Sequence, residues 1–365
     1  MKFEIDAFHF QHKPRVKNLV LFLFCFAVIF GPAFALFDSY NYDTTANPDI
    51  ETYLGLANFD FDQSPVRKYR IIIPFLAAGI HSVFGGLFAG IAPNSFAGPD
   101  FAMCLSFLVV NCVFMSIFGV VVYRLCQAFG ASRLAAIIGL LSVLTCRWTS
   151  YFAGLPIVDS LYVVVIALVL LGIKTKDSRP IIWAIFIGPW AKESFVFIAP
   201  LIFFFSPVSK RKQVLLFAVS ALLVFVFRYC FDQYSHVETG LGLKSDLDHL
   251  HNIPTSLTRL FSFHGLYEII SITGAWGFLF VFLVDKKVRT RLKQKTTLYM
   301  VLFLFVVLIH ALLSVELARM FYLATPVIAV WLALIADAIL PKISGKQQDA
   351  SLSDNTQSES QGASG

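Results

Sequence analysis

The sequence contains few charged residues. Asp, Glu, Lys and Arg make up only 14% of its 365 residues, against 57% hydrophobic residues and a mean hydropathy of +0.73. A soluble domain of this length carries more charge and shorter apolar runs, so we exclude that class. The net charge of +6 collects in short clusters with no basic stripe interleaved with aromatics, which argues against nucleic-acid binding.

Cysteine pairs are also missing. None of the six cysteines belongs to a CxxC pair, and all lie in or beside apolar runs. We therefore expect small buried hydrophobic side chains rather than disulfides or metal ligands. These residues are Cys25, Cys104, Cys112, Cys126, Cys146 and Cys230.

What the chain has instead is a series of long apolar runs. A helix needs about 20 apolar residues to cross about 30 Å of hydrocarbon, and many of the runs approach that length. The sequence predicts an all-α polytopic membrane protein with about eight to eleven transmembrane or re-entrant helices. The runs cover residues 18–37, 70–92, 101–124, 134–150, 155–173, 180–206, 213–230, 266–284, 297–315 and 319–340.

Basic residues favour the cytoplasmic side of a membrane, and this bias predicts the topology. We expect a cytoplasmic N-terminal segment over 1–17 and a transmembrane domain over 18–340, with outer loops at 38–69 and 231–265. The polar tail 341–365 is predicted to be disordered and cytoplasmic. The expected location is the inner (plasma) membrane of a bacterium, crossed several times.

Two apolar runs are expected to be irregular, because simple alternation of ten crossings cannot place every basic cluster in the cytoplasm. The run 70–92 contains Pro74 and a glycine-rich end, which predicts a re-entrant or interfacial segment. The run 180–206 contains GPWAKES, where Gly188 and Pro189 are expected to interrupt the helix. Irregular backbone at membrane depth has to be satisfied by protein or water, so both segments indicate a cavity.

The segment 38–62 gathers six carboxylates and no basic residue. Within it, NPDIETYLGLA predicts a short helix with Asp49 in the first turn, and spacing of four places Asp49 and Tyr53 on one face. One interpretation is a general base, Asp49, near Glu51. The other is a solvated, capped surface helix.

Further ionisable residues border the apolar runs. Arg67, Lys68 and Arg70 precede an apolar helix, where they either bind phosphate or anchor the helix end at the interface. Lys192 and Glu193 interrupt an apolar run, where charged residues are functional candidates unless they neutralise each other.

Later in the chain, Asp159 opens a span, either as an N-terminal helix residue or as a second acidic ligand. Glu316 and Arg319 lie one helical turn apart, which is compatible with a structural salt bridge or a site. The string DLDHLH adds Asp246, Asp248, His249 and His251, with His236 and His264 nearby. A divalent cation is conceivable there, but the spacing matches no established site and favours a hydrated loop.

These motifs resemble the GT-C superfamily of polytopic membrane glycosyltransferases, mannosyltransferase-like enzymes that use polyprenyl-phosphate sugars. The shared features are a D-x-x-x-Y element after the first span (Asp49 to Tyr53), YRIIIPFLA, an aspartate opening a later span (Asp159), WAKESFVFIAPL and ELARMFYLATP. Unlike some relatives, the chain has Thr52 where they carry arginine, and no C-terminal outer domain is expected.

The resemblance implies that Asp49 is the catalytic base, supported by Glu51 or Asp38. It also implies that Arg70, Lys192 and Arg319 neutralise the leaving polyprenyl phosphate. The remaining residues of the expected substrate-binding set are Tyr53, Arg67, Asp159, Glu193 and Glu316.

The expected function is therefore an inverting transfer of a sugar from a polyprenyl-phosphate donor to an acceptor at the outer membrane face. Expected partners are this donor, membrane lipids and glycan-assembly proteins. Two alternatives stay open: a transporter or flippase for a lipid-linked or anionic solute, and a non-catalytic partner in glycan assembly.

Overall fold

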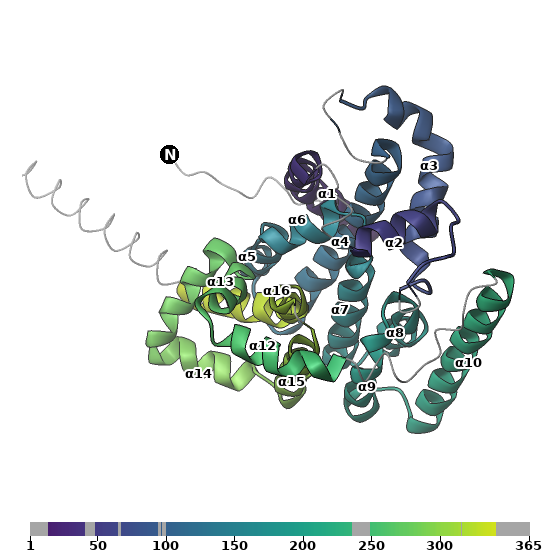
Figure 1. Cartoon of the computed structure of the whole chain (residues 1–365). Coiled ribbons are helices and arrows are strands. Elements are labelled where there is room, and N and C mark those ends of the chain that lie inside the picture. The colour runs from purple at the N-terminus through teal and green to yellow at the C-terminus, as the bar shows by residue number, and fades with distance from the viewer. Residues whose placement is uncertain are drawn as a thin grey trace, which may run out of the picture. The chain divides into compact units, whose positions relative to one another are not determined.

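The computed structural model describes residues 14–40, 48–64, 67–93, 96, 100–235, 249–314 and 316–340. Within these ranges the regular structure is helical and contains no strand (Figure 1). The all-α prediction is thus confirmed. The predicted disordered tail, 341–365, and residues 1–13 of the expected N-terminal segment lie outside the described residues.

Five helices are long and apolar enough to cross a membrane, and the number rises to eight if each of three bent helix pairs forms one span. The predicted number of about eight to eleven transmembrane or re-entrant helices overlaps with this range only at eight. The helices over 159–175 and 178–191 are apolar, but with 17 and 14 residues they are shorter than the other candidates. The five spans are Val16–Ser39, Ile72–Gly90, Phe101–Ala128, Lys210–Ser235 and Leu317–Leu340.

The chain divides into two compact units. Unit 1 comprises Met1–Val120 and Thr149–Val164, and unit 2 comprises Val121–Trp148 and Val165–Gly365. Unit 1 contains α1 (Pro14–Tyr40), α2 (Pro48–Ala57), α3 (Ile72–Gly90) and most of α4 (Phe101–Ala128), with the end of α6 (Arg147–Gly154) and the start of α7 (Asp159–Thr175).

In unit 1, α2 packs on α3, and small residues bring α1 and α6 close together. A Cβ atom built on Gly154 would lie 2.6 Å from the backbone oxygen of Ala33, so only glycine fits at this contact. Close approach over small residues is typical of helices that pack inside a membrane.

Helix α3 corrects one prediction. It runs without a break from Ile72 to Gly90 and is long enough to span, so the segment does not turn back on itself. Pro74 lies in its first turn, where proline removes no intrahelical hydrogen bond. The re-entrant interpretation of 70–92 was therefore wrong.

Unit 2 holds the remaining helices, together with the C-terminal parts of α4 and α7 and the start of α6. They are α5 (Arg133–Leu144), α8 (Ser178–Ala191), η2 (Glu193–Phe197), α9 (Ala199–Phe205), α10 (Lys210–Ser235), η3 (His249–His251), α12 (Asn252–Leu260), α13 (Phe263–Ser271), η4 (Gly274–Val284), α14 (Lys286–Lys295), α15 (Leu298–Leu313), α16 (Leu317–Phe321), η5 (Tyr322–Ala324) and a helix over 325–340.

The predicted interruption of 180–206 is confirmed, but it lies elsewhere. Helix α8 continues through Gly188 and Pro189 and ends where Lys192 adopts an extended conformation (φ −164°, ψ 138°). A 3-10 segment, η2, follows before α9 begins. Gly188 is needed for packing, because a Cβ atom there would lie 2.5 Å from the Phe195 ring.

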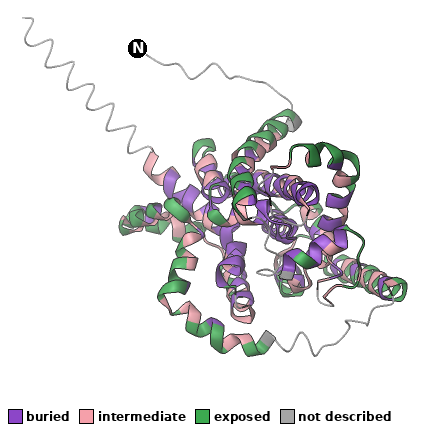
Figure 2. Ribbon diagram, turned by 45° about the horizontal axis from the view of Figure 1, so that its top comes forward, coloured by how far each residue is buried: buried purple, intermediate pink, exposed green. Residues whose placement is uncertain are grey.

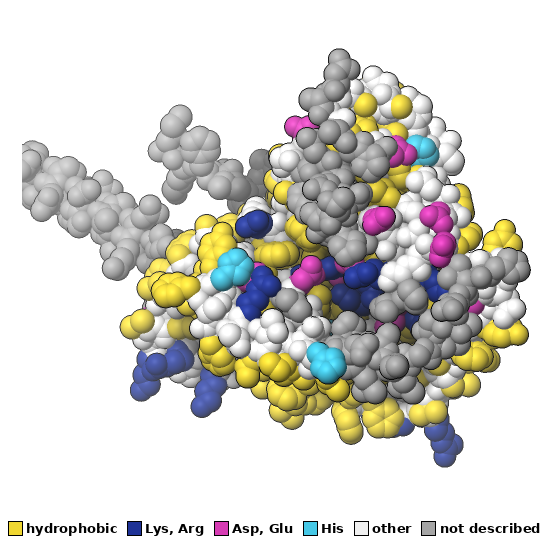
Figure 3. Space-filling model, viewed as in Figure 1, with side chains coloured by type: hydrophobic (Ala, Val, Ile, Leu, Met, Phe, Trp, Pro, Cys, Tyr) yellow, Lys and Arg dark blue, Asp and Glu magenta, His cyan; other side chains and the backbone are white. Residues whose placement is uncertain are grey.

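Many apolar side chains remain exposed. Helix α10 displays Leu215, Leu222, Phe225 and other large hydrophobic residues, and only a small share of its apolar window is buried. Hydrophobic side chains accordingly cover much of the visible surface, and several helices carry exposed residues along most of their length (Figures 2 and 3). Such extensive apolar exposure is that of a surface in contact with lipid rather than water.

Candidate functional site

Helix α2 positions the leading carboxylate as the sequence predicts. Asp49 and Glu51 lie in its first turn, where negative charge interacts favourably with the helix dipole. Asp49 and Tyr53 are both buried, whereas Glu51 is exposed. The interpretation of Asp49 as a solvated surface residue was therefore wrong, and Glu51 is not held in the same environment.

The end of α2 has unusual backbone geometry. Phe59 adopts a left-handed conformation (φ 60°), which usually requires glycine. The amide of Phe59 donates to the Leu56 carbonyl and that of Asp60 to the Gly55 carbonyl, which caps the last turn. The Phe59 ring contacts the rings of Phe61 and Phe75, so the loop after α2 is tied to the first turn of α3.

A short turn then brings the basic residues back to α2. The amides of Arg67 and Lys68 both donate to the Ser64 carbonyl. In this turn Arg67 forms an ion pair with Asp49, and Arg70 Nη1 donates a 2.9 Å hydrogen bond to Tyr53 Oη.

Lys68 completes the group. Its side chain is fully buried, and its ammonium lies 5.1 Å from the centre of the Tyr69 ring. We call Asp49, Tyr53, Arg67, Lys68 and Arg70 the Asp49 cluster. One carboxylate and three cations give it a formal charge of +2. A partly buried cationic group of this kind favours an anion, and phosphate suits the planar arginine fork.

Asp159 also lies in unit 1, at the first turn of α7, and is buried. The loop before it is fixed by the buried Asn111 of α4. The Asn111 amide nitrogen donates to the carbonyls of Leu155 (2.9 Å) and Ile157 (3.0 Å), and its oxygen accepts from Ser160 Oγ (2.6 Å). The aspartate thus follows a loop that neutral hydrogen bonds to Asn111 hold in place.

In unit 2, Lys192 and Glu193 lie at the break between α8 and η2. Glu193 pairs with Arg228 of α10 at 3.4 Å, so a residue beyond the immediate sequence neighbourhood supplies a positive charge. The side chains of Glu193 and Arg228 are partly buried. The predicted break therefore carries an ion pair within an otherwise apolar stretch.

The predicted pair of Glu316 and Arg319 is also present. Arg319 Nη1 donates to Glu316 Oε2 at 2.7 Å. The Arg319 side chain is 6% exposed, whereas the Glu316 side chain is 51% exposed. The Arg319 side chain is thus buried, whereas its acidic partner lies at the surface.

Sequence reasoning missed one further cluster in unit 2. Arg259 of α12 forms an ion pair with Glu268 of α13, and His264 lies 3.3 Å from the same carboxylate. Ser262 caps the start of α13 between them. The S-x-x-G signal at this cap was readable in the sequence, but the nine-residue separation of Arg259 and Glu268 was not.

The remaining candidates are either apart from these groups or outside the described residues. Asp38 is exposed in the last turn of α1. Asp246, Asp248 and His236 lie outside the described residues. In the described part of the chain, no group of three or more His, Cys, Asp and Glu side chains is placed to hold a metal ion.

The structure therefore distributes the candidates between the two units. Asp49, Tyr53, Arg67 and Arg70 come together in unit 1, where Asp159 also lies. Four candidates belong to unit 2, namely Lys192, Glu193, Glu316 and Arg319. No protein-family model matches the chain, and neither a curated protein nor a solved structure was found to match it.

Proposed function

We propose that the protein is an integral-membrane glycosyltransferase that moves a sugar from a polyprenyl-phosphate donor to an acceptor hydroxyl. The observation that carries the proposal is the Asp49 cluster, in which a buried carboxylate lies among cations on a helix and turn between two apolar spans. Transfer of this kind needs both a base for the acceptor and positive charge for the leaving phosphate.

In the proposed reaction, Asp49 accepts the proton of the acceptor hydroxyl as its oxygen attacks the anomeric carbon. The bond from that carbon to the phosphate oxygen breaks, and the polyprenyl phosphate leaves with the electron pair. Attack from the opposite side inverts the anomeric configuration. Arg67 holds Asp49 in place, while Arg70 and Lys68 supply charge for the phosphate.

Arg319 is a second phosphate candidate under this proposal. Its guanidinium is buried and its acidic partner, Glu316, is exposed. An incoming phosphate can replace the exposed carboxylate by accepting the hydrogen bond that Arg319 Nη1 donates to Glu316.

The test is Asp49→Asn, assayed in membranes with radiolabelled undecaprenyl-phosphate hexoses and pentoses. We expect sugar transfer to fall at least about 100-fold, the usual contribution of a general base. Glu51→Gln is the matched control, because it removes an exposed carboxylate from the same turn of α2, and it should retain activity within about threefold. Unchanged turnover in Asp49→Asn would remove Asp49 from the mechanism.

A second pair of variants separates binding from positioning. Arg70→Gln should raise KM for the lipid donor if the guanidinium contacts its phosphate, whereas Tyr53→Phe keeps the guanidinium and removes the hydroxyl that accepts its hydrogen bond. We expect the KM effect of Tyr53→Phe to be the smaller of the two. Equal effects would mean that Arg70 acts only through Tyr53.

The break at Lys192 supports a second candidate, a transporter or flippase for an anionic or lipid-linked solute. Interrupted helices with charged residues are typical of transporter binding sites, and Glu193 and Arg228 form such a pair. Uptake or lipid flipping in proteoliposomes without covalent transfer, lost in Arg228→Gln, would favour this function over the transferase.

A further inference from the structure

Helix α14 differs from every apolar helix around it. Six of its ten residues are Lys or Arg, in the string KKVRTRLKQK. It makes an angle of 86° with α15, which is strongly apolar and begins after a break of two residues. If α15 crosses the bilayer, a helix at this angle lies along the membrane plane, since six charges are too costly to place in hydrocarbon.

The helix is held firmly against the fold of unit 2. Val288 is its buried residue and packs with Leu279, Leu332 and Ile335 in one apolar cluster. Arg291 forms an ion pair with Asp337, whose other oxygen accepts the Ser132 amide. The basic residues of α14 are therefore presented by a fixed element.

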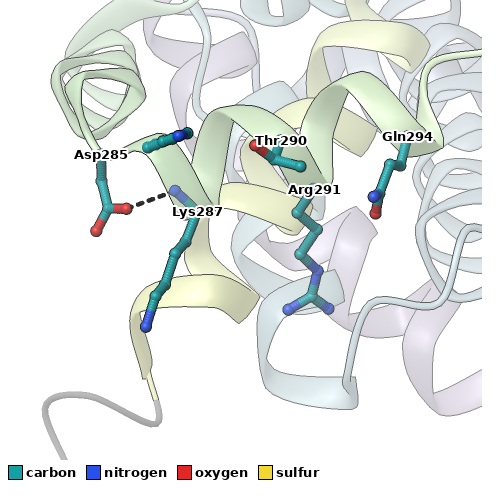
Figure 4. Close-up of a pocket in the computed structure, with 6 residues that line it drawn as sticks. Asp285, Lys287, Thr290, Arg291 and Gln294 are labelled. Atoms are coloured by element: carbon teal, nitrogen blue, oxygen red, sulfur yellow. Dashed lines mark hydrogen bonds between the residues drawn. The ribbon is translucent and has the colours of Figure 1, made fainter.

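An open hollow of about 590 Å³ runs along α14 and is lined by polar and charged side chains. Lys287, Arg291 and Gln294 project from one side of the helix, as their spacing of four and three requires (Figure 4). Basic side chains also project where α14 lies in the space-filling view (Figure 3). The other lining residues are Asp285, Lys286 and Thr290, and no site candidate named above lines this hollow.

The charge in this region is unbalanced. Helix α14 has six basic residues, and two carboxylates, Asp285 and Asp337, interact with it, so the formal net charge of this group is +4. Lys286 and Lys287 are adjacent at the helix start, where the helix dipole disfavours positive charge. The Asp285 carboxylate caps this end by accepting the Lys287 amide at 2.8 Å, which offsets only part of the repulsion. An added anion would stabilise the helix start.

Apolar surface borders α14 on both sides. Phe278, Val281 and Val284 of η4 precede it and are exposed, and so are Leu298, Val301 and Phe305 of α15 after it. An amphipathic ligand with an anionic head and acyl chains matches this combination of basic hollow and apolar flanks. A soluble anion would use only the hollow.

We infer that the α14 hollow is a binding site for the phosphate headgroup of an anionic phospholipid. Lys286 and Lys287 contact the phosphate, while Thr290 and Gln294 offer hydrogen bonds to the rest of the headgroup. The acyl chains lie on the exposed apolar residues of η4 and α15. This site is independent of the proposed transferase chemistry.

The experiment is native mass spectrometry of the full-length protein in non-ionic detergent, titrated with dioleoyl phosphatidylglycerol. Dioleoyl phosphatidylcholine supplies the same chains without net charge, and inorganic phosphate supplies the anion without chains. We expect phosphatidylglycerol to bind at least about tenfold more tightly than either, because each basic residue contributes roughly fivefold. Raising ammonium acetate from about 100 to 500 mM should reduce this preference by screening.

The decisive comparison uses two matched charge removals. The double variant Lys286→Gln, Lys287→Gln should weaken phosphatidylglycerol binding by about tenfold or more. Arg211→Gln with Lys212→Gln removes two adjacent exposed charges from the start of α10 and should change it less than threefold. Lys286→Arg with Lys287→Arg should retain binding.

Three results would overturn the inference. The first is an equal loss of phosphatidylglycerol binding in both double Gln variants. The second is equal binding of the two phospholipids, and the third is binding of inorganic phosphate as tight as that of phosphatidylglycerol. Folding is checked separately by thermal unfolding without added lipid. There the Lys286→Gln, Lys287→Gln protein should be at least as stable as the parent, since the substitution removes repulsion at the helix start.

Discussion

Two ion pairs, one in each unit, are built in opposite ways. In unit 1 the Asp49 side chain is 8% exposed and its partner Arg67 is 32% exposed. In unit 2 the cation, Arg319, is the buried partner, and Glu316 is the exposed one. The buried side chain of each pair is the one that the fold encloses, which is a carboxylate in unit 1 and a cation suited to an anion in unit 2. The two pairs thus favour different ligands.

The largest effect we expect comes from the neutral hydrogen-bond network around Asn111 in unit 1. Asn111→Leu removes the hydrogen-bond partner of the Ile157 carbonyl and of the Ser160 hydroxyl, and it leaves the Leu155 carbonyl with the Ile157 amide alone. The loss should be about 3 kcal/mol of unfolding free energy, measured by thermal unfolding in detergent. If Asn111→Leu lowers the unfolding free energy by less than Arg67→Gln does, the ion pair contributes more to the stability of unit 1 than the neutral network.

Ser106→Ala is the control for this prediction. Ser106 is equally buried on α4, but its hydroxyl donates only to the Ala102 carbonyl of its own helix, at 2.8 Å. Its removal leaves a carbonyl that is still bonded within the helix, so we expect a loss of about 0.5 kcal/mol.

The next effect tests the buried carboxylate. Arg67→Gln removes the cation that faces Asp49 and should cost about 2 kcal/mol, less than for a fully buried pair because Arg67 is partly exposed. Asp49→Asn in the same background should restore part of the loss, because the carboxylate that Arg67 faced is then neutral. A double-mutant cycle measures this coupling, and a coupling near zero would contradict the ion pair's role.

The smallest effect belongs to the exposed carboxylate. Glu316→Gln should cost less than about 1 kcal/mol, since an exposed partner contributes little. The variant should nevertheless gain more thermal stability from added pyrophosphate than the parent does, because the anion no longer competes with Glu316. An equal gain in both proteins would place anion binding away from Arg319.

Local patterns in the sequence predicted the local parts of the site. The first turn of α2 with Asp49, the aspartate at the start of α7 and the pairing of Glu316 with Arg319 all follow from helical spacing or end preferences. Apolar length predicted the membrane helices. Each of these features depends on residues within a few positions of one another.

Contacts between distant segments could not be read in the same way. Arg67 pairs with Asp49, and Arg228 pairs with Glu193, only because turns and helix packing bring segments that are distant in the sequence close together in space. The break in 180–206 lies at Lys192 rather than at Gly188. Pro189 cannot donate to the Ile185 carbonyl four residues earlier, but the Ser220 hydroxyl of α10 donates to it at 2.9 Å, so the helix continues. Tertiary packing overrode the local breaker in that segment.

The left-handed Phe59 has a consequence for how the region moves. A glycine at this position would relieve the backbone but would lose the ring contacts with Phe61 and Phe75. With the rings in place, residues 58–64 follow α2 directly and contact α3 through Phe75, so they should open as one cooperative unit. Amide hydrogen exchange should therefore be slow and occur at similar rates across residues 58–64. In Phe59→Gly the individual amides should exchange faster and at different rates.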